Sequence, residues 1–126
     1  MAKKVLSNLN DSFADFKNSK MVEVFAKKAQ LTMEHPLPND AEWNAMVKQF
    51  KANMPATYQF FFEERKLSRL EFYTCILLIL DFDESAIVGL TQSSSSAISI
   101  AKGRANSKLF HETGAKRLKY NLKRLL

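Results

Sequence analysis

The sequence predicts an all-α protein. Its 126 residues include only three glycines and three prolines, so few positions favour tight turns or broken elements. β-Branched residues are sparse, and apolar residues recur at the three- and four-residue spacing of helices rather than at the alternating spacing of strands. Hydrophobic residues make up 46% of the chain, which is enough to form a core. The length suits one domain or a compact pair of helical subdomains.

The N-terminal region, residues 1–66, is expected to hold helices separated by a rigid linker. Scattered apolar residues suggest a leading helix within 1–18. Ser19 is a candidate cap for a helix over 20–30. Prolines in 35–38 push the residues before them out of helical geometry, so this stretch is predicted to be the linker.

Two further helices should complete this region. Asn39 or Asp40 can begin the first, and its expected core residues are Trp43, Met46, Val47 and Phe50. Pro55 suits the first turn of the second. The side chains of this second helix expected to share one face are Tyr58, Phe61 and Phe62, with 63–66 pointing to water.

The C-terminal region, residues 67–126, begins with a capping signal. Ser68 with Glu71 three residues later predicts a helix that continues through Leu80. Asp81 is expected to adopt the left-handed conformation after this helix, and Asp83 to cap the next one. The core positions of that short helix are Ile87 and Leu90.

A longer helix follows a short polar turn and is capped by Ser94. Its buried spacing is Ile98, Ala101, Ala105 and Leu109, which predicts a helix over about 95–109. The last helix, from about Ala115 to Leu126, carries a stripe of Leu118, Leu122 and Leu125. This stripe favours packing onto the helix's own domain, with pairing of two copies as the second choice.

Two helices joined by a short turn, the second with small polar side chains outside, form a geometry that fits the DNA major groove. The outer side of the second helix is expected to hold Ser95, Ser96, Ser99, Ile100, Gly103, Asn106 and Ser107. Serine hydroxyls can bond to phosphates or base edges, and an isoleucine can contact a thymine methyl. The residues predicted to contact DNA are Ser94, Ser95, Ser96, Ser99, Ile100, Lys102, Gly103, Arg104 and Lys108.

The distribution of charge supports this prediction. Residues 101–126 contain eight Lys and Arg against Glu112 alone, a net charge of +7. The other hundred residues contain eleven basic and twelve acidic side chains, a net charge of −1. A phosphate-binding surface requires such a concentration. Lys102, Arg104 and Lys108 are expected to bind phosphates, although a solvated basic tail would have the same composition.

An ordered set of short motifs runs through residues 67–110. The motifs are L-S-x-x-E at Leu67, Ser68 and Glu71, I-x-x-L at Ile87 and Leu90, S-x-x-x-(V/I)-S at Ser94, Ile98 and Ser99, and K-L at Lys108 and Leu109. This set resembles the LuxR-like C-terminal helix-turn-helix of bacterial transcription regulators. The resemblance implies N-terminal helices packed on a LuxR-like bundle that binds double-stranded DNA, with a homodimer through the last helix as an alternative.

Residues further upstream extend the resemblance over about 19–126. They are Asp40 with Trp43 (one residue further apart than is usual), Pro55, and Leu67 with Cys75. This order is similar to the C-terminal end of large bacterial regulators that carry tetratricopeptide repeats and often a membrane span. The resemblance implies an output module from which the sensor is missing. A longer parent protein could then span a membrane, although this segment would not contact one.

Three residues depart from the family pattern. Gly103 stands at a groove-facing position that usually carries a longer side chain, and Ser93 replaces the apolar residue of the turn. Asp81 stands where the family generally has glycine. No Arg, Asn or Gln lies at the leading end of the second helix, so the strong bidentate contacts to bases are missing. These features predict weak sequence discrimination and a loosely packed turn.

Other functions have less support in the sequence. The lone Cys75 falls in an apolar helix, and the acidic residues around Asp81 are better explained as caps than as a metal site. His35 and His111 have no nucleophile or ligand spacing nearby, so we expect no enzyme activity, cofactor or metal. No signal peptide is visible, and the apolar run at 75–80 is far shorter than the about 20 residues of a membrane span, so a cytoplasmic location is expected.

The main alternative is a degenerate helix-turn-helix that acts as a protein-interaction or dimerisation module. It would dock through the final helix or through aromatic residues of the N-terminal region, namely Trp43, Tyr58 and Phe61. This alternative requires those aromatic side chains to form an exposed apolar patch.

Overall fold

The computed structural model describes residues 11–30 and 37–126, and every regular element in these two ranges is helical. The predicted all-α fold is therefore confirmed. In chain order the helices are α2 (Phe13–Lys17), α3 (Lys20–Gln30), α4 (Asp40–Asn53), α5 (Pro55–Tyr58), the π-helix η1 (Gln59–Glu64), α6 (Arg69–Ile79), α7 (Glu84–Thr91), α8 (Ser95–Phe110) and α9 (Leu118–Lys123).

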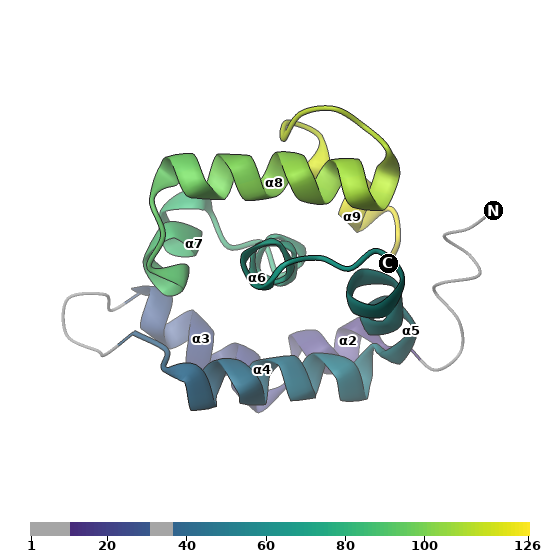
Figure 1. Ribbon diagram of the computed structural model, residues 1–126. Helices are drawn as coiled ribbons and strands as arrows, with labels where there is room; N and C mark the ends of the chain where they lie inside the picture. The colour runs from purple at the N-terminus through teal and green to yellow at the C-terminus, as the bar shows by residue number, and fades with distance from the viewer. Residues whose placement is uncertain (1–10, 31–36) are drawn as a thin grey trace.

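Helix α6 is the centre of the molecule. Figure 1 shows it end-on, with α7, α8 and α9 on one side and α2, α3 and α4 on the other. It contacts α7, α8 and α9 directly. On the opposite side, Tyr73 of α6 stacks on Trp43 of α4 with the ring centroids 3.8 Å apart. Because α6 is apolar on nearly all sides, it is stable only when surrounded.

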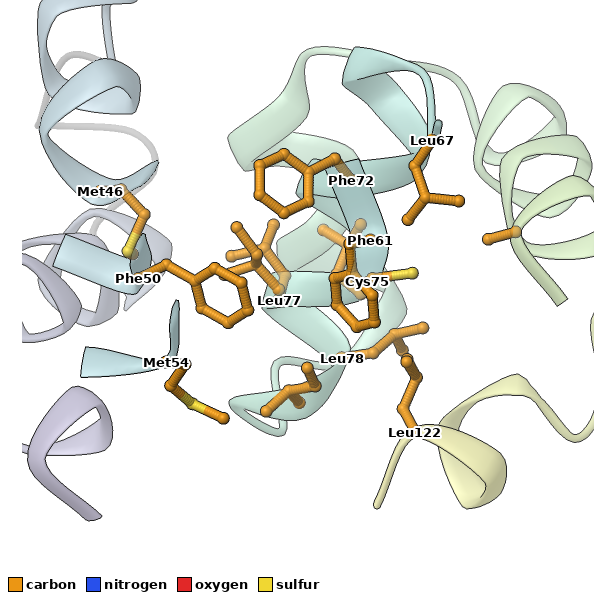
Figure 2. Close-up of a cluster of buried hydrophobic side chains, with 14 of the residues drawn as sticks. Met46, Phe50, Met54, Phe61, Leu67, Phe72, Cys75, Leu77, Leu78 and Leu122 are labelled. Atoms are coloured by element: carbon orange, nitrogen blue, oxygen red, sulfur yellow. The ribbon is translucent and has the colours of Figure 1, made fainter. Parts of the chain in front are cut away.

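One hydrophobic cluster joins the N-terminal and C-terminal regions. Figure 2 shows side chains from α4, η1, α6 and α9 meeting in it. The expected core residues of α4 lie inward, with Trp43, Met46 and Phe50 buried and Val47 partly buried. The predicted stripe on α9 is buried as well, and its residues are Leu118, Leu122 and Leu125. The prediction that α9 packs onto its own domain is confirmed.

The caps follow the sequence closely. Ser68 and Glu71 form a capping box at the start of α6, and Asn39 forms one with Glu42 at the start of α4. Asp83 accepts a hydrogen bond from the Ala86 amide at 2.8 Å, which caps α7. Pro55 occupies the first turn of α5, and Asp81 is left-handed with φ 68°. These features depend on three or four adjacent residues and are therefore readable from the sequence.

Ser19 does not cap α3 as predicted. The helix does start at Lys20, but the Ser19 hydroxyl is buried and has no hydrogen-bond partner among the described residues. Its backbone amide instead donates to the Phe16 carbonyl at 3.1 Å. The turn between α2 and α3 is so short that it buries the hydroxyl instead of directing it to the α3 amides.

The aromatic residues after Pro55 lie in a different register from the predicted one. Phe61 is buried as expected, but Phe60 is buried beside it and Phe62 is 46% exposed. The cause is η1, because a π-helix bonds residue i to i+5 and so rotates each side chain away from its α-helical position. Phe62 still stacks on Tyr58, with centroids 5.4 Å apart.

Some predictions fall partly outside the described residues. The leading helix within 1–18 is described only from residue 11, where it consists of α2. Of the linker at 35–38, only Leu37 and Pro38 are described, and neither is helical. No helix within the described ranges combines the length and the apolar character that crossing a membrane requires.

Candidate nucleic-acid interface

Helices α7 and α8 are joined by a turn of three residues. Gln92 ends α7 in the left-handed conformation with φ 56°, and the Ser93 amide donates to the Val88 carbonyl at 3.2 Å. The Ser94 hydroxyl then accepts from the Ala97 amide at 3.0 Å and caps α8. Ser93 itself is partly buried, and its hydroxyl donates to the Thr91 carbonyl at 3.3 Å. Backbone bonds therefore hold this turn where an apolar side chain is missing.

The inner side of α8 is as the sequence predicts. Ile98, Ala101, Ala105 and Leu109 are all buried. Two of them are alanines, and α8 has extensive contacts with α6 beneath it. Small side chains at these positions suit close packing of α8 against α6.

The outer side of α8 is open to solvent over its first turns. The exposed residues are Ser94, Ser95, Ser96, Ser99, Ile100, Arg104, Ser107 and Lys108. Ile100 is 55% exposed, which is unusual for so large an apolar side chain. Helices α2, α3 and α4 lie on the far side of α6 and cover none of this surface (Figure 1).

The prediction that Asn106 lies on the outer side is wrong. Asn106 is fully buried, and its Nδ2 donates to the Gly114 carbonyl at 2.9 Å. Its Oδ1 accepts from Asn121 Nδ2 of α9 at 3.0 Å, and the same Nδ2 donates to Glu112 at 3.1 Å. The segment 111–117 thus folds back over the C-terminal part of α8, as Figure 1 shows. Spacing within α8 alone could not reveal this cover.

Gly103 lies beneath the same segment. A Cβ at Gly103 would lie 3.9 Å from the Gly114 carbonyl carbon, the nearest described atom outside the adjacent residues and the backbone of its own helix. Gly103 is partly exposed, and the predicted contact with DNA would compete with this neighbour.

Two of the three expected phosphate ligands already have partners within the protein. Lys102 Nζ lies 3.8 Å from Glu84 Oε1, and its side chain is only 19% exposed. The Ser95 hydroxyl donates to the other oxygen of Glu84 at 2.6 Å. Lys108 Nζ lies 2.7 Å from Glu71 Oε1. Arg104 is exposed and has no ion-pair partner among the described residues.

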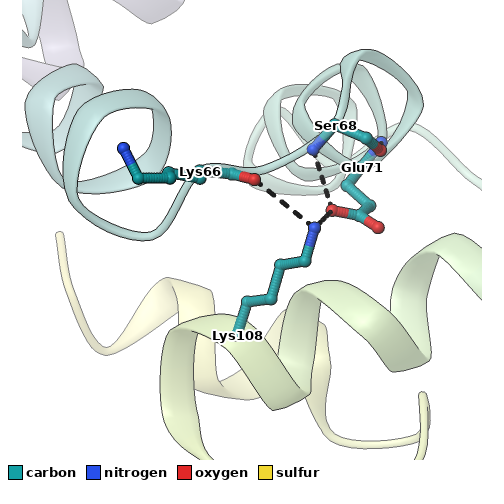
Figure 3. Close-up of polar contacts among 4 residues, drawn as sticks. All are labelled: Lys66, Ser68, Glu71 and Lys108. Carbon is teal, nitrogen blue, oxygen red and sulfur yellow. Dashed lines mark hydrogen bonds and ion pairs between the residues drawn. The ribbon is translucent and has the colours of Figure 1, made fainter.

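Figure 3 shows how Lys108 connects α8 to the start of α6. Its ammonium donates to Glu71 Oε1 at 2.7 Å and to the Lys66 carbonyl at 3.4 Å. The Ser68 amide donates to the same Glu71 oxygen at 2.9 Å. Burial by itself raises the pKa of Glu71, but the hydrogen bonds from Lys108 and Ser68, with the charge of Lys108, outweigh it and hold the pKa below its ordinary value.

The structure adds basic residues that the sequence analysis missed. Arg65 lies with a guanidinium nitrogen 3.3 Å from His111 Nε2 at the end of α8, and the Lys66 carbonyl bonds Lys108. Arg69 is exposed and lines a surface depression with Gln92 and Ser93 of the turn. Together with two residues of α8 they form what we call the cationic edge: Arg65, Lys66, Arg69, Arg104 and Lys108.

The missed residues carried a signal. Three basic residues surround the Ser68 cap within five positions. Residues 65, 66 and 69 lie outside the stretch 101–126 that carries the excess positive charge, so the distribution of charge along the chain does not reveal this cluster. Only the packing of α6 against α8 brings the two groups together. Glu63 and Glu64 precede the edge on η1 and offset part of its charge.

The aromatic docking surface of the alternative hypothesis is mostly absent. Trp43 is 5% exposed and Phe61 is buried, so neither can bind a partner. Tyr58 is partly buried, and Phe62 is the exposed aromatic side chain in that part of the molecule.

No protein-family model, curated protein or solved structure was found to match this chain. Cys75 is buried and its pKa is raised by that burial, which leaves the thiol unreactive. Within the described ranges, no three His, Cys, Asp or Glu side chains are placed to hold a metal ion.

Proposed function

We propose that this protein binds double-stranded DNA, with the first turns of α8 in the major groove. The observation that carries this proposal is the open side of α8 beside the cationic edge. A major groove about 12 Å wide admits one helix. Helix α8 has 16 residues and extends about 24 Å, with its capped end free of the covering segment 111–117.

The side chains on this surface suit a weak reader of sequence. The hydroxyls of Ser96 and Ser99 can bond to phosphates or base edges, and Ile100 can pack on a thymine methyl. The amides at the start of α8 favour a phosphate. Arg104 is an exposed cation on α8 without an ion-pair partner among the described residues, and Arg69 lies beside the turn that precedes the helix, so we assign both to phosphates. Most of the affinity then comes from the DNA backbone and falls steeply with salt.

Such a module would act as the output part of a bacterial transcription regulator of the LuxR-like kind. A protein-interaction or dimerisation role is the second candidate, and the exposed Phe62 and Tyr120 are its best remaining residues. A homodimer through α9 would have to use residues other than the three buried leucines.

Fluorescence anisotropy on a mixed-sequence duplex tests the proposal. We expect binding at low salt, with log affinity falling linearly against log salt concentration. Arg104→Ala and Arg69→Ala should each reduce the slope by about 0.9, since each removes one phosphate contact. Lys102→Ala should change it less, because Lys102 is held by Glu84.

A matched control removes two exposed lysines from the opposite side of the molecule, Lys20→Gln on α3 with Lys48→Gln on α4. It should leave the slope unchanged. The proposal fails if the wild-type protein does not bind any duplex at low salt, or if the control lowers affinity as much as Arg104→Ala does.

A further inference from the structure

Helix α9 presents a charged aromatic surface to solvent. Its leucines face α6, and the opposite side carries Tyr120, which is 55% exposed. The guanidinium carbon of Arg117 lies 5.0 Å from the Tyr120 ring centroid, and that of Arg124 lies 5.6 Å from it. We call Arg117, Tyr120 and Arg124 the α9 face.

Helix α9 and the cationic edge lie on opposite sides of α8. Arg104 and Lys108 of α8 point towards the start of α6, where Ser68 and Glu71 lie. Asn106 points towards α9, where Asn121 bonds it. Positions 104 and 106 are about 200° apart around a helix. If a duplex holds α8 in its major groove, its two backbone strands pass on the two sides of α8, one on the side of the cationic edge and the other on the side of α9.

The charges of the α9 face argue against self-pairing. In a two-fold dimer a surface meets a copy of itself, so Arg117 and Arg124 would lie against the same cations. The acid near them is Glu112, whose carboxylate lies 3.8 Å from Arg117 Nε. The Arg117 side chain is 57% exposed and the two atoms are 3.8 Å apart, so the pair is weak and a phosphate could replace it. The complementary partner is a polyanion.

We propose that the α9 face binds the phosphodiester backbone of the DNA strand on its side of α8. The protein would then contact both strands that border the major groove around α8. The inference rests on the proposed function and extends it, because it assigns a DNA contact to α9, for which the sequence favours packing onto its own domain and gives pairing of two copies as the second choice. Guanidinium groups bind phosphate oxygens in bidentate fashion, and the Tyr120 hydroxyl can donate to a third oxygen.

The test compares salt slopes of duplex affinity for the wild type and the double variant Arg117→Gln with Arg124→Gln. Both arginines are exposed, so the fold should survive, and a thermal melt followed by circular dichroism checks this. Loss of two phosphate contacts should reduce the slope by about 1.8. The Lys20→Gln, Lys48→Gln variant should not change it. Arg117→Lys with Arg124→Lys keeps the charge and should retain most of the slope.

The outcomes separate the two proposals. If the wild type binds and the Arg117→Gln, Arg124→Gln variant keeps the full slope, the inference is overturned while the role of α8 stands. The face would then be left to an acidic protein partner. If the wild type binds no duplex, both proposals fail. If the Lys20→Gln, Lys48→Gln variant loses as much slope as the Arg117→Gln, Arg124→Gln variant, the effect is one of total charge, and the inference is again overturned.

Discussion

One carboxylate oxygen of Glu71 joins the start of α6 to the C-terminal half of α8. That oxygen accepts from the Ser68 amide at 2.9 Å and from Lys108 at 2.7 Å, and Lys108 also holds the Lys66 carbonyl (Figure 3). The side chain of Glu71 is only 4% exposed. A buried carboxylate is tolerated only when it is paired and hydrogen-bonded, so this group positions α8 relative to α6.

The lowered pKa of Glu71 predicts a pH dependence of stability. Because the folded state binds this proton less tightly than the unfolded chain, the carboxylate stabilises the fold above its ordinary pKa near 4.5 and loses this effect as the pH falls through the lower folded value. Glu71→Gln should cost about 1–3 kcal/mol at pH 7 and less at pH 3. Urea unfolding of the variant and wild type at both pH values measures the difference.

The control for this prediction is Glu23→Gln on α3, which removes an exposed carboxylate 3.9 Å from Lys27. It should change the free energy of unfolding by less than about 0.5 kcal/mol at either pH. An equal loss for Glu71→Gln at pH 7 and pH 3 would contradict the role assigned to its charge.

Two glycines inside helices offer a test at the scale of the element. A Cβ at Gly89 of α7 would meet nothing within 4 Å, and one at Gly103 of α8 would meet only an atom 3.9 Å away. Neither residue has a positive φ. Gly89→Ala and Gly103→Ala should therefore each stabilise the protein by up to about 1 kcal/mol, since alanine loses less backbone entropy in a helix. Thermal melts measure both.

Duplex binding separates the two glycines further. Gly89 lies on α7 and is not among the residues proposed to contact DNA, so its alanine variant should bind DNA like the wild type. If Gly103 faces segment 111–117 rather than DNA, Gly103→Ala should also bind DNA like the wild type. A loss of affinity for Gly103→Ala alone would instead support the original prediction that this residue faces the groove.

At this scale, the sequence predicts what neighbouring residues determine. The capping box of Ser68 and Glu71, the cap at Ser94 and the left-handed Asp81 each depend on local hydrogen bonds or sterics, and all were predicted. The register of Phe60 and Phe62 was missed because a π-helix leaves no clear pattern in a single sequence. The burial of Asn106 was missed because its partners come from a loop and another helix.

For the whole molecule, the count of C-terminal charges overstates what is available for a partner. Of the eight basic residues in 101–126, five lie within 4 Å of a carboxylate: Lys102, Lys108, Arg117, Lys119 and Lys123. Two of these, Lys119 and Lys123, share Asp81 and lower its pKa, chiefly through the Lys123 hydrogen bond. Packing also supplies cations that the count left out, at Arg65, Lys66 and Arg69. The sequence thus shows where basic residues concentrate along the chain, and the fold determines which of them remain exposed.

The central claim is that the open side of α8 meets duplex DNA. Backbone amide NMR suits a 14.4 kDa protein and reports contact residue by residue. On titration with a mixed-sequence duplex at low salt, the account predicts the largest shift changes over residues 95–100 and at Arg104, with little change in α3 and α4. Changes confined to α3 and α4, or none at all, would contradict it.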